Sequence, residues 1–519
     1  MANRLVAIIE IGSTWIRLLV AEIEGRQWRI LDRAGRPAVL GRDVFTTGEL
    51  SRESFLECLS VLHNFSELLA GWGIANEDIY VIATSALRVA RNRDVVIDRI
   101  QQETGYKVSI IEGIEENRLM YLAVRYSLKQ DISQFWRGNS MIIEVGGGST
   151  EIMLLRKGQM VAAHSIRLGT ILIDQQMKLK MGVPPERYLH ESIRNASGIL
   201  NSEMDLASVR FLVAAGTDAR MAAERAGNDL NENCKVINRD DFFAFAQKVR
   251  SYSNEDCVHK LKISYADADG FIPGIMVLKL FFEQTNAAKL VVPFVSIREG
   301  FLVDMVLGVA TELQEDFLSQ IIASAVNLGR KFHADEHHSR HVADLALIIF
   351  DNLVKEHGMN RRQRMLLEIA GILHDVGMYI KSSGHQKHSQ YIVGNSEIFG
   401  LHRDEMGVIA NVVRYHRGEP PAQSDIKYIS LQREDRILVL KLASILRVAD
   451  ALDRSHSQNI KTITLERSGE AIIIHAQTQA LAEGEQKGAP PADISIERIG
   501  IEEKAGMFQD VFGFKIMLK

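Results

Sequence analysis

Along residues 1–310, short apolar runs rich in β-branched side chains alternate with stretches in which apolar residues recur at helical spacing. This pattern predicts an α/β fold, because buried strands read as continuous apolar runs and the covering helices carry one apolar stripe. The first half predicts strands at 5–11, 16–23, 28–32, 77–84 and 107–112, and helices at 52–71, 91–104 and 115–127. The same order then returns, with strands at 141–145, 150–156, 159–166 and 210–215, and with helices and a strand over 261–310. The sequence therefore predicts one α/β plan used twice.

From about residue 315 the pattern changes to apolar residues at helical spacing, as in VADLALIIFDNLVKEHG and ILVLKLASILRVADALD. The last sixty residues return to alternation, in KTITLE, AIIIHAQ and FGFKIMLK, which predicts a small sheet. We therefore expect four domains: α/β subdomains at 1–133 and 134–312, an all-helical domain at 313–458 and a small sheet-containing domain at 459–519.

Composition adds few constraints, but each narrows the class of protein. A chain of 519 residues is too long for a single core, and 46% hydrophobic with 24% charged residues is typical of soluble globular protein. Its three cysteines show neither metal nor disulfide spacing, which favours a reduced, cytoplasmic setting. Glu10 interrupts the first apolar run, so we expect a strand there rather than a signal peptide, and no run is long enough to span a membrane.

One phrase occurs twice, as LVAIIEIGSTW at 5–15 and MIIEVGGGSTE at 141–151. Each copy is an apolar run that ends in a glutamate and turns through glycine into Ser-Thr. Glycine amides and hydroxyls suit phosphate oxygens, while the carboxylate suits a divalent cation or a water molecule. A single turn of this kind is common in hairpins, but its repetition with an acid at the same place favours a binding site. AAGT at 214–217 is a third strand-to-glycine turn.

Two further candidates lie in the first half. Arg88, in TSALR, ends a predicted strand, and its guanidinium can donate a bidentate pair of hydrogen bonds to phosphate. Glu115 and Glu116 open the predicted helix at 115–127, where they serve either catalysis or the helix N-terminus, which favours negative charge. With a net charge of −5, the chain must meet any anionic substrate through such a local group.

Seven motifs occur in order: IEIGST, ATSALR, EGIEENRL, EVGGGSTE, AGT, ADGFIPG and SIREGFL. In this order they resemble the exopolyphosphatase/guanosine pentaphosphate phosphohydrolase family over about 1–310, and the histidine-rich remainder looks like the helical domain that many members append. The resemblance implies duplicated actin-like, ribonuclease-H-like subdomains with the site in the cleft between them, and a homodimer. It also implies Mg²⁺-dependent hydrolysis of a terminal phosphoanhydride, which releases orthophosphate from inorganic polyphosphate.

The resemblance further implies roles for particular residues. Glu116 would activate the attacking water and Arg88 would bind the phosphate that is removed. The phosphate-binding set would be Gly12, Ser13, Thr14, Gly146, Gly147, Gly148, Ser149, Thr150, Gly216 and Thr217. The carboxylates that hold metal or water would be Glu10, Glu144 and Glu151.

The chain departs from the family pattern at four positions. Members usually have aspartate at the positions of Glu10 and Glu144, asparagine at Thr14 and glycine at Ala215. Compared with aspartate, glutamate has one more methylene group, which moves the carboxylate by about 1 Å. A misplacement of that size at a reacting group can lower the rate by about 10²-fold. The paired change indicates either a cleft widened on both sides, or a weaker catalyst or a different preferred metal.

The helical part carries His338, His374, Asp375 and Asp450 in the order of an HD-type metal phosphohydrolase domain. Imidazole with carboxylate suits Mn²⁺, Fe or Zn²⁺ better than Mg²⁺, so we expect such a metal here. His385, His388 and His416 can extend this set to two metals. The alternatives are a scaffold without metal, or a basic channel for a long anionic chain that also uses Lys387, Arg414 and Arg417.

Together these features predict a cytoplasmic, Mg²⁺-dependent exopolyphosphatase. One alternative keeps the cleft but hydrolyses guanosine pentaphosphate. Another places nucleotide hydrolysis in the HD-type domain and leaves the cleft as a sensor, and a third is a regulator that binds polyphosphate or nucleotide without turnover. A sugar or acetate kinase is disfavoured because no acceptor or nucleoside site is evident. Nucleic acid is disfavoured as well, because no basic stripe with interleaved aromatic residues is present.

Overall fold

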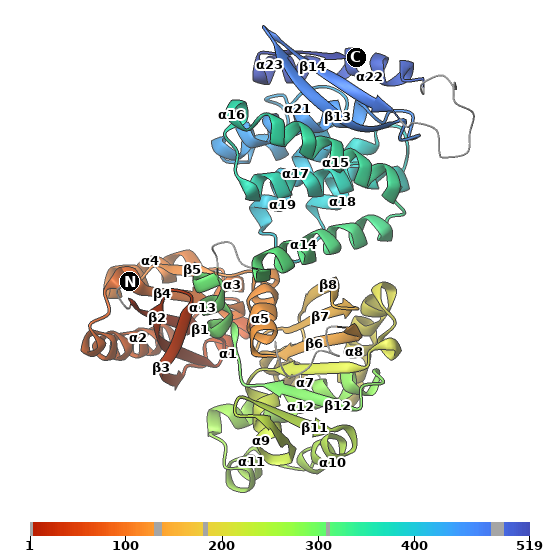
Figure 1. Ribbon diagram of the computed structural model, residues 1–519. Helices are drawn as coiled ribbons and strands as arrows, with labels where there is room; N and C mark the ends of the chain where they lie inside the picture. Colours follow the sequence, from red (N-terminus) through yellow and green to blue (C-terminus); the bar gives the residue numbers. More distant parts are fainter. Residues whose placement is uncertain (1–3, 129–136, 180–184, 308–311, 479–492) are drawn as a thin grey trace. The chain divides into compact units, whose positions relative to one another are not determined.

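Two mixed sheets and a helical region with a third, small sheet make up the computed structural model (Figure 1). The structure describes residues 4–128, 137–179, 185–307, 312–478 and 493–519. The chain divides into an N-terminal unit, Met1–Gln320, and a C-terminal unit, Ile321–Lys519. The expected boundary at 133/134 lies outside the described residues. Within those residues, no helix combines the length and the apolar character that crossing a membrane requires.

The first sheet has the strand order β3-β2-β1-β4-β5, in which β1 is antiparallel to β2 and parallel to β4. Its strands are β1 (Arg4–Ile11), β2 (Trp15–Glu24), β3 (Gln27–Pro37), β4 (Ile79–Ala83) and β5 (Val108–Ile110). The helices around it are α1 (Leu40–Thr47), α2 (Arg52–Trp72), η1 (Asn76–Asp78), α3 (Ser85–Val89), α4 (Arg93–Thr104) and α5 (Gly113–Ser127). All five strands predicted from the sequence form, although β3 runs beyond the predicted 28–32 and α1 was not predicted.

The second sheet repeats this plan and extends it. Its order is β10-β11-β12-β9-β6-β7-β8, and the part β8-β7-β6-β9-β12 has the same order and strand directions as β3-β2-β1-β4-β5. Its strands are β6 (Asn139–Val145), β7 (Thr150–Arg156), β8 (Gln159–Ile166), β9 (Phe211–Ala215), β10 (Asn228–Asn231), β11 (Cys234–Asn238) and β12 (Lys289–Pro293). The internal duplication predicted from the sequence is therefore present in the topology.

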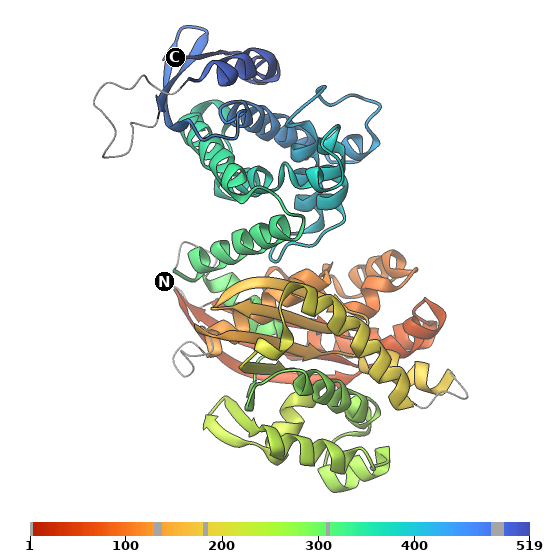
Figure 2. The ribbon, with the colours of Figure 1, turned by 90° about the vertical axis from the view of Figure 1, so that its right-hand side faces the viewer.

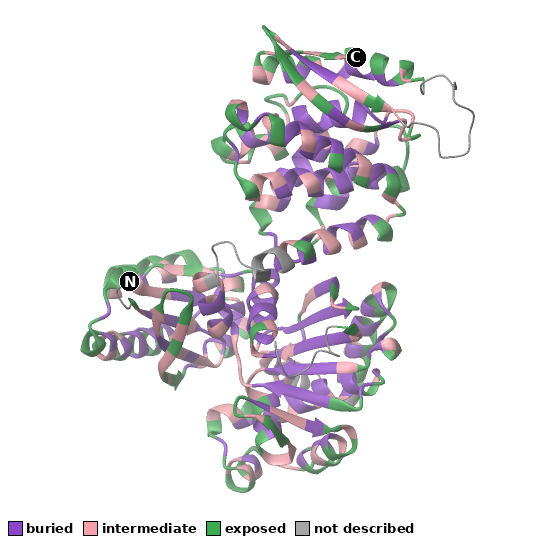
Figure 3. Ribbon diagram, in the orientation of Figure 1, coloured by how far each residue is buried: buried purple, intermediate pink, exposed green. Residues whose placement is uncertain are grey.

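Helices cover the second sheet on the face that carries its core. They are α7 (Thr170–Leu179), α8 (Pro185–Glu203), η2 (Leu206–Ser208), α9 (Thr217–Ala226), α10 (Arg239–Val249), α11 (Asn254–Leu261) and α12 (Tyr265–Glu283). The last helix of this half, α13 (Ile297–Leu307), lies elsewhere. Ile193 and Leu200 of α8 share one core with Ile143 and Leu154 of the sheet, and α8 crosses that face in Figure 2. The alternating positions of β6 and β7 are thus buried on both sides, which explains their continuous apolar runs (Figure 3).

Two helices lie between the sheets and join the halves of the N-terminal unit. Helix α5 packs against β7 and β8 of the second sheet and against α13, which in turn contacts β1 of the first sheet. The approach of α13 to α5 is very close, because a Cβ on Gly300 would lie 1.9 Å from the Leu119 carbonyl oxygen. Although α13 falls within the segment 134–312 that was assigned to the second half, it packs against an element of the first.

The C-terminal unit is helical and ends in a three-stranded sheet, β13-β14-β15. Its helices are α14 (Glu312–Lys331, which spans the unit boundary), α15 (Glu336–Asn352), α16 (Val354–His357), α17 (Arg361–Leu373), η3 (Val376–Tyr379), α18 (His385–Gly394), α19 (Arg403–Tyr415), α20 (Ile426–Ile429) and α21 (Arg433–Ala451). The remaining elements are β13 (Ile460–Ser468), β14 (Ala471–Thr478), α22 (Ser495–Lys504), α23 (Gly506–Phe512) and β15 (Lys515–Leu518). The predicted change from α/β to helices and then to a small sheet is confirmed.

Candidate active site

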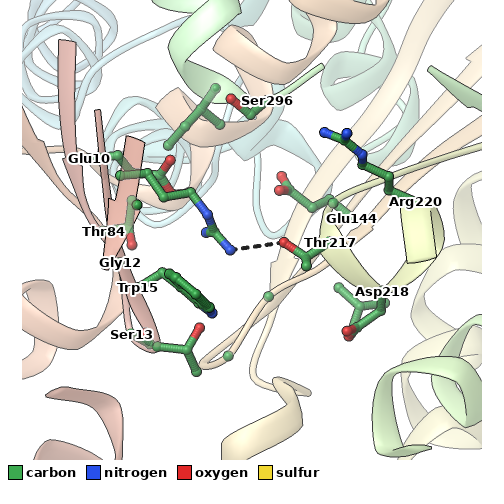
Figure 4. Close-up of a pocket in the computed structure, with 18 of the residues that line it drawn as sticks. Glu10, Gly12, Ser13, Trp15, Thr84, Glu144, Thr217, Asp218, Arg220 and Ser296 are labelled. Carbon is green, nitrogen blue, oxygen red and sulfur yellow. Dashed lines mark hydrogen bonds between the residues drawn. The ribbon is translucent and has the colours of Figure 1, made fainter. Parts of the chain in front are cut away.

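The two copies of the repeated phrase form equivalent hairpin turns that face each other. In the first turn the Gly12 amide donates to the Trp15 carbonyl at 2.9 Å, and in the second the Gly146 amide donates to the Ser149 carbonyl at 2.9 Å. The tips approach so closely that a Cβ on Gly147 would lie 3.0 Å from the Ser13 Cβ. Both turns line one cavity of about 520 Å³ between the two sheets (Figure 4). The sequence repeat therefore builds one site from both halves of the N-terminal unit.

The glutamates that end β1 and β6 both line this cavity. Glu10 is held by Arg298, whose Nε lies 3.1 Å from its Oε2. Burial, together with the nearby Glu10 and Glu116 carboxylates, raises the pKa of Glu144 to about 8. The buried Glu144 carboxyl group therefore holds its proton more tightly than usual, and Arg17 and Arg298 offset this only partly.

Glu116 lies in the first turn of α5 and also lines the cavity. Arg88 of α3 pairs with it and donates a second hydrogen bond to the Ile111 carbonyl at 2.7 Å. Burial raises the pKa of Glu116, although Arg88 opposes the shift. Arg88 itself does not line the cavity, so in this structure its guanidinium orients Glu116 and is not directed at the space where a phosphate would bind.

Glu151 is the most firmly held of the cavity carboxylates. It accepts hydrogen bonds from Ser149 Oγ at 2.7 Å, Ser165 Oγ at 2.8 Å and Asn117 Nδ2 at 3.0 Å. Its side chain is almost fully buried, and burial raises its pKa well above the usual value for a carboxyl group. These partners come from the turn before β7, from β8 and from α5, so the position of Glu151 depends on the contact between the two halves.

Most of the predicted phosphate-binding residues line the cavity: Gly12, Ser13, Thr14, Gly146, Gly147, Ser149, Gly216 and Thr217. Figure 4 shows Gly12 and Ser13 on one side with Glu144 and Thr217 on the other. Gly216 has φ +95°, a conformation that favours glycine and allows α9 to begin directly at the cavity.

Two predicted phosphate-binding residues lie elsewhere. The Thr150 hydroxyl is fully buried and donates to the Leu168 carbonyl at 2.6 Å. It is the first residue of β7, where successive side chains point to opposite faces, so it turns away while Glu151 turns in. Gly148 packs against Phe45 and Ser85 instead of lining the cavity.

The sequence reasoning missed several residues that line the cavity, above all its arginines Arg17, Arg33, Arg220 and Arg298. Arg17 of β2 crosses to the other half, where it donates to Thr217 Oγ1 at 3.0 Å (Figure 4, dashed line). Arg298 lies within the motif SIREGFL, where no local pattern distinguishes it as a cavity residue. Trp15 and Asp218 also line the cavity, and the indole N–H donates to Asp267 at 3.0 Å. Burial and the neighbouring Asp267 raise the pKa of Asp218 well above the usual carboxyl value.

In the C-terminal unit, the four predicted metal ligands His338, His374, Asp375 and Asp450 come together. The Nε2 atoms of His338 and His374 lie 3.8 Å and 3.7 Å from Asp450 Oδ1. His416 and His456 complete further groups with these residues. His385 and His388 are in none of the groups found among the described residues, although His385 pairs with Asp375. His456 was not predicted, and its ring stacks on His338 with centroids 3.6 Å apart.

Comparisons with known proteins agree with this fold. Residues 19–308 match the Ppx/GppA phosphatase family, and residues 322–484 match domain III of Ppx/GppA phosphatases. A guanosine-5'-triphosphate,3'-diphosphate pyrophosphatase of Pseudoalteromonas atlantica is 24% identical over 464 residues, 88% of each chain. A protein of the same name from Aliivibrio fischeri is 23% identical over 473 residues, 89% of this chain and 91% of its own.

Among solved structures, an exopolyphosphatase of Cytophaga hutchinsonii is similar to 59% of this chain over 99% of its own length, with a TM-score of 0.54 and 20% identity. An exopolyphosphatase-like protein matches 59% of this chain with a TM-score of 0.50 and 19% identity. These likenesses support the fold alone, and the HD-type assignment of the helical part stays a prediction. Because the family match to residues 19–308 covers more than half of the sequence, this chain belongs to the Ppx/GppA phosphatase family.

Proposed function

We propose that the cavity between the two sheets hydrolyses the terminal phosphoanhydride bond of inorganic polyphosphate and releases orthophosphate. The observation that carries this proposal is the meeting of two acid-ended hairpins across one cavity. Phosphoryl transfer depends mainly on positioning and on stabilising charge, and in this arrangement both walls of the cavity carry hydrogen-bond donors and a carboxylate.

The charge on the cavity wall supports a divalent cation as part of the site. Eight acidic residues and four arginines line it, and the raised pKa values of Glu144 and Glu151 are those of crowded, buried carboxylates that a cation could compensate in place of protons. Carboxylate oxygens are the ligands that Mg²⁺ prefers, and Glu10, Glu144 and Glu151 are the residues that would hold it. Bound there, Mg²⁺ would neutralise phosphate oxygens and strengthen the electrophilic character of the phosphorus.

The residues of the cavity bind the phosphate, accept the proton from water and position the groups that react. The amides and hydroxyls of the turns at Gly12 and Gly146 hold the terminal phosphate by its oxygens. Glu116 accepts a proton from the attacking water, and its raised pKa brings it closer to the range in which a general base works at neutral pH. Arg88 fixes the carboxylate of Glu116 and so acts as a positioning residue. Arg298 lies at the wall beside Glu10 and offsets negative charge there.

Guanosine pentaphosphate is the second candidate substrate, because the same chemistry removes its terminal phosphate. The names of the curated relatives, which this chain matches over 88% or more of their length in the two cases above, favour it. The Trp15 ring at the cavity wall gives an aromatic surface on which a guanine base can stack.

Release of orthophosphate from long-chain polyphosphate and from guanosine pentaphosphate, each with Mg²⁺, tests the proposal. Glu116→Gln is expected to lower kcat by about 10²–10⁴-fold on the true substrate, the usual contribution of a general base. Arg88→Ala is expected to lower kcat as well, because Glu116 loses the group that orients it.

Glu115→Gln is the matched control. Glu115 is the neighbouring residue on α5, but it pairs with Arg118 and does not line the cavity. It is expected to keep kcat even if it lowers the melting temperature. A wild-type rate in folded Glu116→Gln would end the proposal, and a preference between the two substrates would decide which one the cavity serves.

A further inference from the structure

A cluster of imidazoles and carboxylates in the C-terminal unit has the organisation of a metal centre with more ligands than one ion needs. Its members are His338 of α15, His374 and Asp375 after α17, His385 of α18, His416 after α19 and Asp450 of α21. The four imidazoles and Asp450 are buried. All six lie in the C-terminal unit, and none of them lines the cavity of the N-terminal unit.

The tautomers of the imidazoles are set by contacts on their Nδ1 atoms. In His374, His385 and His416 this atom lies 2.7, 2.9 and 2.6 Å from the carbonyl oxygens of Gly371, Ser382 and Val413. Because a carbonyl can only accept, each Nδ1 carries the proton and each neutral ring keeps a lone pair on Nε2. His338 has the same arrangement with a carboxylate, Asp453, at 2.7 Å. This outer support is what orients histidine ligands toward a metal.

The Nε2 atoms of His338 and His374 have no hydrogen-bond partner among the described residues, although both are buried. An unpaired buried acceptor is costly, so these two atoms indicate a missing ligand. They face Asp450 Oδ1 at 3.8 and 3.7 Å and Asp375 Oδ2 at 4.0 and 3.6 Å. Four ligand atoms at such separations can surround one ion.

The other oxygen of Asp375 faces a second pair of imidazoles. Its Oδ1 lies 3.0 Å from His385 Nε2 and 3.6 Å from His416 Nε2, and these two nitrogens are 3.3 Å apart. Asp375 therefore presents one oxygen to each of two groups of ligand atoms, which is the geometry of a bridging carboxylate.

We propose that the C-terminal unit binds two divalent transition-metal ions bridged by Asp375. The first ion takes His338, His374 and Asp450, and the second takes His385 and His416. The prevalence of imidazole favours Mn²⁺, Fe²⁺ or Zn²⁺ over Mg²⁺. Lys504 of α22 pairs with Asp450 Oδ2, so only Oδ1 is left for the ion, and the last helices of the chain are tied to the centre as its outer support.

Mn²⁺ titration of the chelator-treated full chain tests this proposal, with millimolar Mg²⁺ present to occupy the carboxylate-lined cavity. Wild type is expected to bind two Mn²⁺ ions tightly and to give the electron paramagnetic resonance signal of an exchange-coupled pair. His385→Ala is expected to keep one tight ion and lose the coupling. Asp375→Asn is expected to lose the coupling and weaken both sites.

His388→Gln is the matched control, because His388 lies three residues after His385 on α18, yet among the described residues only His385 of the two pairs with Asp375. It is expected to behave as wild type. Circular dichroism shows whether each variant is folded, and His385→Ala keeps the test decisive if Asp375→Asn unfolds. A wild-type protein that binds no coupled pair, or coupling that survives in folded His385→Ala, overturns the proposal.

Discussion

The contact between the two hairpin tips can be tested by adding one methyl group to it. In Gly147→Ala the new Cβ would lie 3.0 Å from Ser13 Cβ and 3.1 Å from Ile171 Cδ1. Carbon atoms prefer separations of about 3.5–4.0 Å, so the tips must move apart by about 0.5–1 Å. A displacement of about 1 Å at reacting groups costs about 10²-fold in rate. We therefore expect kcat for phosphate release to fall by about 10–100-fold.

The assay is steady-state release of orthophosphate well below the melting temperature, with circular dichroism to confirm folding. Gly71→Ala is the matched control, since Gly71 lies within α2 and a Cβ there meets nothing within 4 Å. It should keep the wild-type rate and gain about 0.5–1 kcal/mol of stability from a better helix former. A wild-type kcat and KM in Gly147→Ala would refute the reasoning that the two turns form one site.

Three more perturbations follow from the structure. In the presence of chelator, the free energy of unfolding should fall as pH rises from about 4.5 toward 8, because the folded state holds the Glu144 proton more tightly than the unfolded chain. Urea titrations of wild type and Glu144→Gln at several pH values measure this. The same dependence of the unfolding free energy on pH in both proteins would contradict the prediction. Gly300→Ala should destabilise the N-terminal unit by about 1–3 kcal/mol or more, because its methyl group would collide with the Leu119 carbonyl; an unchanged melting temperature would argue against the packing of α13 on α5. Removal of metal by chelator should abolish phosphate release, and Mg²⁺ should restore it; full activity without a divalent cation would exclude the role given to the carboxylates.

The sequence predicted central strands such as β6 and β7 because they bury both faces and therefore read as unbroken apolar runs. The repeat of IEIGST and EVGGGSTE predicted that the two turns share a function, and the structure brings them into contact. Helix α1 was not predicted, and the exposed and half-buried end of β3 carries no apolar pattern that could mark it as strand. These elements depend on their neighbours rather than on local sequence.

The site was predicted less completely than the fold, for a geometric reason. Ser149 and Thr150 are adjacent in sequence, but only the first faces the cavity, because β7 begins between them. Arg17 reaches Thr217 across the cavity, and no local pattern marks a contact between residues so far apart in the chain. The residues of the proposed HD-type centre were easier to predict because histidines are concentrated in this part of the sequence. Asp453 and His456 were not predicted, because their contacts with His338 join distant parts of the chain.

The position of α13 bears on how the protein is made. Helix α5 is synthesised early, but the helix that covers it closes only after the whole second sheet has left the ribosome. During translation, the surfaces of α5 and β1 that α13 covers are therefore exposed until α13 is made. A fragment that ends before Ile297 would keep these surfaces exposed. Because the contact between α5 and α13 joins the two halves, we expect them to unfold in one transition and not separately.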